Sequence, residues 1–153
     1  MSDLRAAFLG STYGRAGERV SLTPAGPGIV PHWCEAGQRW AIVTAWNPSG
    51  QRAAPDLNDE RQAALARLVW AWSPLPGWNG EGPWREETLI LRDVPLREAA
   101  RLGRRFGQAA VVWGVGGRAA LVWLDGPVRP ERCWLRRAAD SPGTADCGYT
   151  AGL

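Results

Sequence analysis

The chain has 153 residues and a mass of 16.6 kDa, the size of a single domain with short extensions. Hydrophobic residues make up 45% of the sequence and charged residues 22%, so the chain can bury a sizeable core, and wholesale disorder is excluded. The net charge of +3 is mild, and it permits an anionic partner without requiring one.

The sequence has no apolar run long enough for a transmembrane helix and no secretory signal at its N-terminus. We therefore expect a soluble, cytoplasmic protein with no membrane partner. Three widely spaced cysteines and a single histidine, His32, provide no metal-binding motif, no disulfide framework and no Ser-His-Asp triad. These counts predict no metal and no cofactor.

All 18 basic residues are arginine, and ten of the fourteen aromatic residues are tryptophan. Codon bias in a GC-rich genome explains the arginines, and selection for function is the alternative. In either case, arginine binds phosphates and carboxylates through its planar fork and stacks on indole rings.

Glycine and proline crowd residues 1–37, which predicts an irregular N-terminal arm with at most a short strand at 20–22. A core domain follows over residues 38–126. Its first element is a buried strand at 39–46, ended by Asn47-Pro48. Apolar residues at helical spacing then predict a helix over 56–72.

Residues 73–84 contain Trp78, Trp84 and several prolines and glycines, so we expect a loop or a bent edge element. A second strand is predicted at 86–94. A second helix should begin after Pro95 and end near residue 106. Its outer face would carry a basic ridge of four arginines, Arg97, Arg101, Arg104 and Arg105.

Two apolar segments flank Gly116-Gly117, which predicts a β-hairpin because such a turn requires positive φ angles. If Val115 pairs with Arg118, the register places Trp113 opposite Ala120 and Trp123 opposite Ala110. Residues 127–153 should form a basic segment and a flexible C-terminal tail. The order of elements favours an α+β two-layer sandwich, with a mainly antiparallel sheet and two helices on one face. A ferredoxin-like fold is the nearest analogue.

Three segments carry a family resemblance, namely residues 40–48 (WAIVTAWNP), 84–88 (WREET) and 102–113 (LGRRFGQAAVVW), together with Asn58 and Arg61. The chain resembles, over about residues 38–124, a bacterial family known as domain of unknown function 3293. Thr88 stands where members of the family commonly have serine. The resemblance implies no activity, and it places the family signature on Thr44, Trp46, Asn47, Pro48, Asn58, Arg61, Glu86, Phe106, Gly107 and Gln108.

Four of these polar residues lie at the ends of predicted elements, so we expect Asn47, Asn58, Glu86 and Gln108 to converge at one rim of the sheet. The alternative is structural: the two asparagines cap a turn and a helix, Glu86 pairs with Arg61 or Arg104, and Gln108 satisfies a loop carbonyl. The full candidate binding set is Thr44, Trp46, Asn47, Asn58, Arg61, Trp84, Glu86, Arg104 and Gln108.

The first functional hypothesis is a non-catalytic module that binds RNA, single-stranded DNA or a protein partner. Indoles such as Trp40, Trp46 or Trp123 on an exposed sheet face would stack on bases beside the arginine ridge. The alternative is a small enzyme for a phosphorylated or nucleotide-like substrate, with Glu86 as general base. A third possibility is a homodimer with tryptophans at its interface.

Overall fold

Within residues 2–138, which the computed structural model describes, the chain forms three α-helices and eight β-strands. The helices are α1 (Ser2–Leu9), α2 (Pro55–Val69) and α3 (Leu96–Arg105). The strands are β1 (Thr12–Arg15), β2 (Glu18–Thr23), β3 (Arg39–Val43), β4 (Leu75–Asn79), β5 (Glu86–Arg92), β6 (Ala110–Val115), β7 (Arg118–Trp123) and β8 (Arg129–Arg137). No helix in this part of the chain has the length and apolar character needed to cross a membrane.

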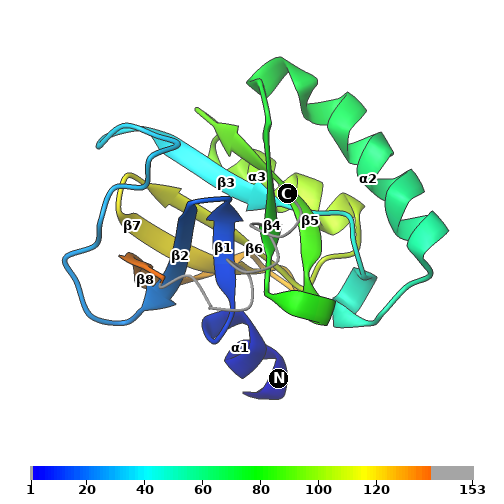
Figure 1. Cartoon of the computed structure of the whole chain (residues 1–153), viewed down its shortest axis with the longest axis horizontal. Coiled ribbons are helices and arrows are strands. Elements are labelled where there is room, and N and C mark those ends of the chain that lie inside the picture. The colour runs from blue at the N-terminus through cyan, green and yellow to red at the C-terminus, as the bar shows by residue number, and fades with distance from the viewer. Residues whose placement is uncertain (1, 139–153) are drawn as a thin grey trace, which may run out of the picture.

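The strands form one antiparallel sheet in the order β1-β2-β8-β7-β6-β3-β5-β4, which curls until its two edges meet (Figure 1). At the junction, the amide of Gly80 donates to the Thr12 carbonyl at 2.9 Å. The buried guanidinium of Arg19 donates to the carbonyls of Gly14 at 2.7 Å and of Trp78 at 2.6 Å. Arg19 therefore links β1 to β4 and nearly closes the sheet into a barrel.

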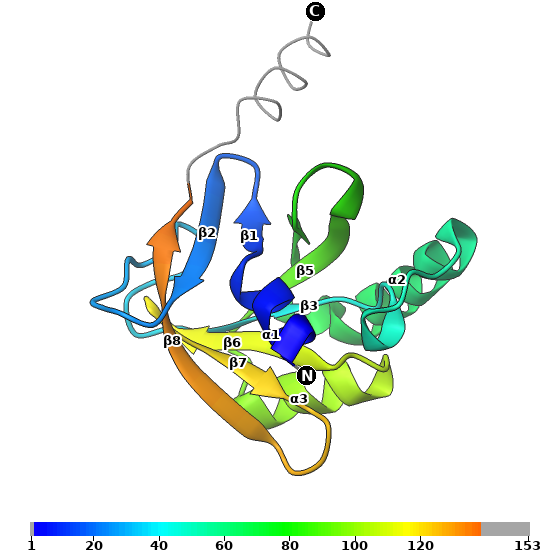
Figure 2. The same ribbon diagram turned by 90° about the horizontal axis from the view of Figure 1, so that it is seen from below.

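The predicted two-layer sandwich with two helices on one face is wrong. The sheet contains β1, β2 and β8, which lie in segments predicted to be an irregular arm and a basic segment. These extra strands let the sheet curl around on itself instead of remaining open. A third helix, α1, lies across the lower end of the barrel, as the view from below shows (Figure 2). Residues 139–153 of the predicted tail lie outside the described residues.

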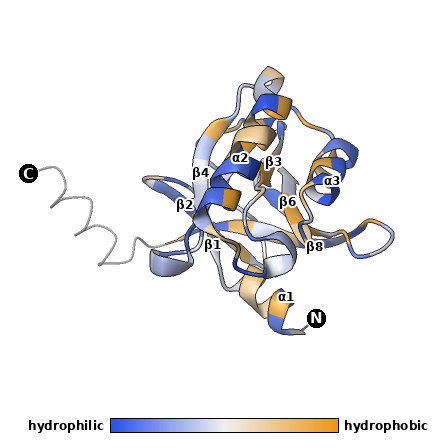
Figure 3. Ribbon diagram, turned by 90° about the vertical axis from the view of Figure 1, so that its right-hand side faces the viewer, coloured by the Kyte–Doolittle hydropathy of each residue, from blue (hydrophilic) through white to orange (hydrophobic). Residues whose placement is uncertain are grey.

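The alternation of side chains along each strand separates two cores. On β3, Trp40 and Ile42 point into the barrel, whereas Ala41 and Val43 point outward and pack beneath α2 and α3. Figure 3 shows both helices on the same side of the molecule, with hydrophilic stretches on each. The rim of the barrel at the end of β3 therefore lies close to the start of α2.

The central hairpin has the predicted register. Val115 pairs with Arg118, Trp113 with Ala120 and Trp123 with Ala110. Gly116 has a φ of 56°, which is the left-handed conformation that the turn requires.

Candidate functional site

Two asparagines join the end of β3 to the first turn of α2. The Asn58 side chain is buried, and its Oδ1 accepts from the Asn47 amide at 3.0 Å while its Nδ2 donates to Asn47 Oδ1 at 3.0 Å. Asn47 Oδ1 also accepts from the amide of Ala53 at 2.9 Å. Asn47 has a φ of 45°, a conformation that asparagine tolerates better than most residues. This pair holds residues 47–53 against the helix.

Glu86 and Gln108 extend this cluster to two further strands. Asn47 Nδ2 donates to Glu86 Oε2 at 2.7 Å, at the first residue of β5. Gln108, just before β6, donates through Nε2 to the carbonyl of Trp46 at 2.9 Å. The structure thus brings all four predicted residues to one rim of the barrel. We call Asn47, Asn58, Glu86 and Gln108 the polar cluster.

The local roles that the alternative interpretation assigned to these residues hold only for Gln108, which bonds the carbonyls of Trp46 and Phe106. Ala54, not Asn58, is the N-cap residue of α2, and Asn47 makes no side-chain cap. Among the described residues, no arginine forms a salt bridge with Glu86. The cluster is therefore built from contacts between elements that are distant in sequence.

The Glu86 and Asn47 side chains separate two hollows. The outer groove has a volume of about 470 Å³, and its lining includes Trp46, Arg52, Trp84, Arg85 and Glu86. The inner cavity, on the barrel side, has a volume of about 40 Å³, which is enough for one or two water molecules. A carboxylate in this position can accept hydrogen bonds or a proton from a ligand in the groove.

Burial raises the pKa of Glu86 above its usual range, and the hydrogen bond from Asn47 opposes that rise. Within residues 2–138 this half-buried carboxylate has no cationic partner, and a carboxylate with a raised pKa in such a setting is typical of functional sites. Within residues 2–138, no group of three or more His, Cys, Asp or Glu side chains is arranged to hold a metal ion.

We expect Glu86→Gln to be at least as stable as the natural protein at pH 7. Because the folded-state pKa is raised, the folded protein holds the Glu86 proton more tightly than the unfolded chain does, and stability falls as the pH rises through that interval. Glutamine keeps an acceptor for Asn47 without the buried charge. Thermal unfolding of both proteins between pH 4 and pH 8 measures this difference, which should grow with pH. The interpretation is contradicted if the stability of the variant falls relative to that of the natural protein as the pH rises.

The other predicted site residues divide into two groups. Thr44 Oγ1 donates to the Glu87 carbonyl at 2.7 Å and accepts from the Trp46 amide at 3.0 Å, so it fixes the end of β3. Trp46 and Trp84 line the outer groove. Arg104 lies elsewhere, where it donates to the Gly126 carbonyl and lines a hollow between α2 and α3. No hydrogen bond in the described structure joins Arg61 to the polar cluster.

The predicted stacking platform is wrong for two of its three indoles. Trp40 and Trp123 are 0% and 2% exposed, because both point into the barrel.

The outward face of the central strands carries a different set of tryptophans and arginines. Trp113 on β6 lies beside Ala120 on β7, which lies beside Arg132 on β8, and in the adjoining row Arg118 lies beside Trp134. We call Trp113, Arg118, Arg132 and Trp134 the tryptophan–arginine face.

The tryptophan–arginine face lines a hollow of about 1020 Å³. The indoles of Trp113 and Trp134 are partly exposed, and the side chains of Arg118 and Arg132 are exposed. The indole of Trp113 is oriented by a 2.9 Å hydrogen bond from its Nε1 to the Val94 carbonyl. The lining residues belong to the described part of the chain, and none of them is acidic. The register of Trp113 and Arg118 was predicted from the sequence, whereas β8, which supplies the other two residues of the face, was not.

These observations define a small antiparallel β-protein with a nearly closed sheet, two helices against its outer face and a polar cluster at one rim. Residues 43–111 match the model of the family described as "Protein of unknown function (DUF3293)", so the resemblance seen in the sequence is confirmed over this segment. The segment includes the whole polar cluster. No curated protein and no solved structure matches the chain.

Proposed function

We propose that the protein binds single-stranded nucleic acid, RNA or DNA, on its tryptophan–arginine face. The observation that carries this proposal is the placement of two partly exposed indoles and two exposed arginines in adjoining rows of one sheet. Bases stack on aromatic rings with little dependence on sequence, and arginine binds the phosphates between them. The tryptophan–arginine face therefore offers aromatic rings for the bases and guanidinium groups for the phosphates on one continuous surface.

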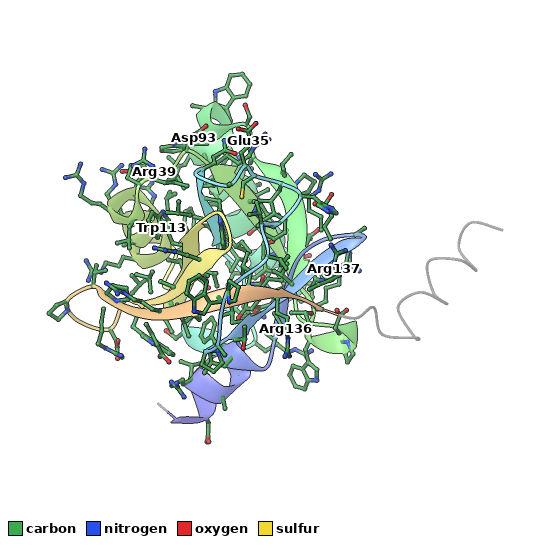
Figure 4. The ribbon with its side chains drawn as sticks, turned by 90° about the vertical axis from the view of Figure 1, so that its left-hand side faces the viewer. Glu35, Arg39, Asp93, Trp113, Arg136 and Arg137 are labelled. Atoms are coloured by element: carbon green, nitrogen blue, oxygen red, sulfur yellow. The ribbon has the colours of Figure 1, made fainter. Side chains whose placement is uncertain are left out.

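The surroundings of this face add to its positive charge. Arg39 lies beside Val115 in the same row as Arg118, and Arg136 lies two residues beyond Trp134 on the same face of β8. Figure 4 looks onto this side of the molecule, where Arg39, Trp113 and Arg136 project from three different strands. The arginines can contact successive phosphates of a strand that follows the hollow.

The test is the affinity of a fluorescein-labelled oligonucleotide of about eight nucleotides, measured by anisotropy at several salt concentrations. The double variant Arg118→Ala/Arg132→Ala should bind at least about tenfold more weakly at low salt. Its log–log salt dependence should be shallower by about 1.4, because each of the two lost phosphate contacts on a single strand contributes about 0.7 to the slope.

The matched control is Arg67→Ala/Arg105→Ala, which removes the same charge from exposed positions on α2 and α3. It should retain most of the affinity. An equal loss in both double variants, or no binding by the natural protein at low salt, overturns the proposal. Sedimentation adds a further outcome: a dimer that Arg118→Ala/Arg132→Ala dissociates assigns the face to self-association instead.

The second candidate is an enzyme that acts on a phosphorylated or nucleotide-like substrate, with Glu86 as general base. It is favoured by the position of the half-buried carboxylate between a water-sized cavity and an open groove. Turnover of a panel of nucleotides and phosphate esters by the natural protein and by Glu86→Gln tests it. Turnover that is unchanged in the variant rejects Glu86 as the base.

A further inference from the structure

The outer groove is a second candidate site, separate from the tryptophan–arginine face. The groove opens beyond the C-terminal end of β3, at Trp46 and Asn47, whereas the row of Arg39, Val115 and Arg118 begins at the N-terminal end of that strand. Its volume of about 470 Å³ falls in the range of pockets that hold small organic ligands. The residues that line it indicate which ligand would fit.

The Glu86 carboxylate is held in place but retains acceptor capacity. Asn47 Nδ2 bonds Oε2 at 2.7 Å, and Asn47 is itself fixed through its Oδ1 by Ala53 and Asn58. A carboxylate offers about four acceptor positions, and this is its one hydrogen bond within the described structure. Since no arginine pairs with it there, its natural complement is a ligand with adjacent N–H donors.

An aromatic ring and two cations complete the groove. Trp84 is 73% exposed, and the guanidinium of Arg52 lies 5.0 Å from the centre of its ring. A planar base can stack on such an indole or on the guanidinium plane. Arg52 uses one N–H to bond the Pro83 carbonyl, which leaves other donors, and Arg85 also lines the groove. A phosphate attached to the base would be attracted by both arginines.

From this combination we infer that the outer groove binds a guanine base, with the Glu86 carboxylate accepting from its N1–H and N2–H. Guanine presents these two donors side by side. Adenine and cytosine place a ring acceptor beside their amino group, and uracil has a single N–H between two carbonyls, so each of them would meet the carboxylate with an acceptor. The inference is independent of the strand-binding proposal, and it gives Glu86 a binding role that is an alternative to the role of general base.

The direct test is calorimetric titration with GMP, IMP and AMP. GMP should bind about 10- to 100-fold more tightly than AMP, since hydrogen bonds to a charged group are among the stronger ones. IMP lacks the N2 amino group and should fall between them. Glu86→Gln should remove most of the preference for GMP over AMP, and lowering the pH until Glu86 is protonated should do the same.

Two further variants keep the test interpretable. Glu87→Gln changes the exposed neighbour of Glu86 by the same atoms, and it should leave the GMP preference intact. Trp84→Ala removes an exposed ring and should weaken GMP and AMP alike, because stacking does not distinguish the bases. Equal affinities for GMP and AMP, or equal losses in Glu86→Gln and Glu87→Gln, overturn the inference for a free nucleotide.

A nucleic-acid strand could also place a guanine base in the outer groove. Pentanucleotides UUGUU and UUAUU, titrated against Arg118→Ala/Arg132→Ala, separate this source from the free nucleotide because the tryptophan–arginine face is disabled. A guanine preference for the strand alone identifies a base presented by nucleic acid. A preference for GMP alone identifies a free nucleotide. Absence of any guanine preference in both forms overturns the inference, whatever the result for the tryptophan–arginine face.

Discussion

Replacing Trp40 with alanine is expected to destabilise the protein by about 3–5 kcal/mol, the usual cost of truncating a buried tryptophan. Trp40 is 0% exposed and lies inside the barrel, where its ring meets Trp33 edge-on at 5.8 Å. Its Nε1 donates to the Gly116 carbonyl at 2.9 Å, so the variant also leaves a buried carbonyl without its partner. Urea unfolding followed by circular dichroism measures the loss, which is a large share of the stability of a small domain.

The matched control is Trp70→Ala. Trp70 lies just after α2 and is 77% exposed, so its removal should change the free energy of unfolding by no more than about 0.5 kcal/mol. The comparison tests whether the barrel interior, and not indole content in general, supports the fold. Similar losses for the two variants contradict the assignment of Trp40 to the core.

The parts of the fold that could be predicted depend on local sequence. The Gly116-Gly117 turn determines its own register, and the structure has that register at every pair from Val115 to Ala110. The size match within the hairpin, of Trp113 with Ala120 and of Trp123 with Ala110, follows from the same turn. The match between β3 and β6 is not local, because these two strands are distant in sequence. An added Cβ at Gly114 would lie 2.4 Å from the indole of Trp40, so a glycine on β6 makes room for a large ring on β3.

The barrel could not be predicted in this way, because its closure depends on contacts between distant segments. β8 carries five arginines or prolines among its nine residues, and only Cys133 and Leu135 point into the core. From its composition alone this segment is typical of a charged terminus, and it is a strand only because it pairs with β2 and β7. The arginine that joins β1 to β4, Arg19, has no local signal either.

The same distinction separates the site residues. Polar side chains at element ends predicted the polar cluster, since the strand and helix ends meet at one rim. The positions of Arg61 and Arg104 depend on the rotation and packing of two helices, and the structure places Arg104 beside Gly126 instead. Trp40 and Trp123 share the inward parity of their strands, and only the curl of the sheet decides that this side is enclosed.

Asn58→Asp is expected to destabilise the protein by about 2–3 kcal/mol at neutral pH, the cost of a buried polar contact turned unfavourable. The substitution is nearly isosteric, but it replaces the Nδ2 donor with an oxygen that faces Asn47 Oδ1 at about 3.0 Å. Two acceptors then oppose each other, and a negative charge enters a site where the Asn58 side chain is buried. The loss should diminish at low pH, where protonation restores a donor. Chemical denaturation at pH 4 and pH 7.5 measures both effects.

Asp59→Asn is the matched control, because it makes the reverse chemical change at the next, exposed position of α2 and should alter stability by no more than about 0.5 kcal/mol. Asn58→Asp should also affect ligand binding in the outer groove. Asn58 holds Asn47, and Asn47 holds the Glu86 carboxylate, so Asn58→Asp should weaken the preference for GMP over AMP even under conditions where the variant is folded. A folded variant with an undiminished preference would show that Glu86 is oriented without this pair of asparagines.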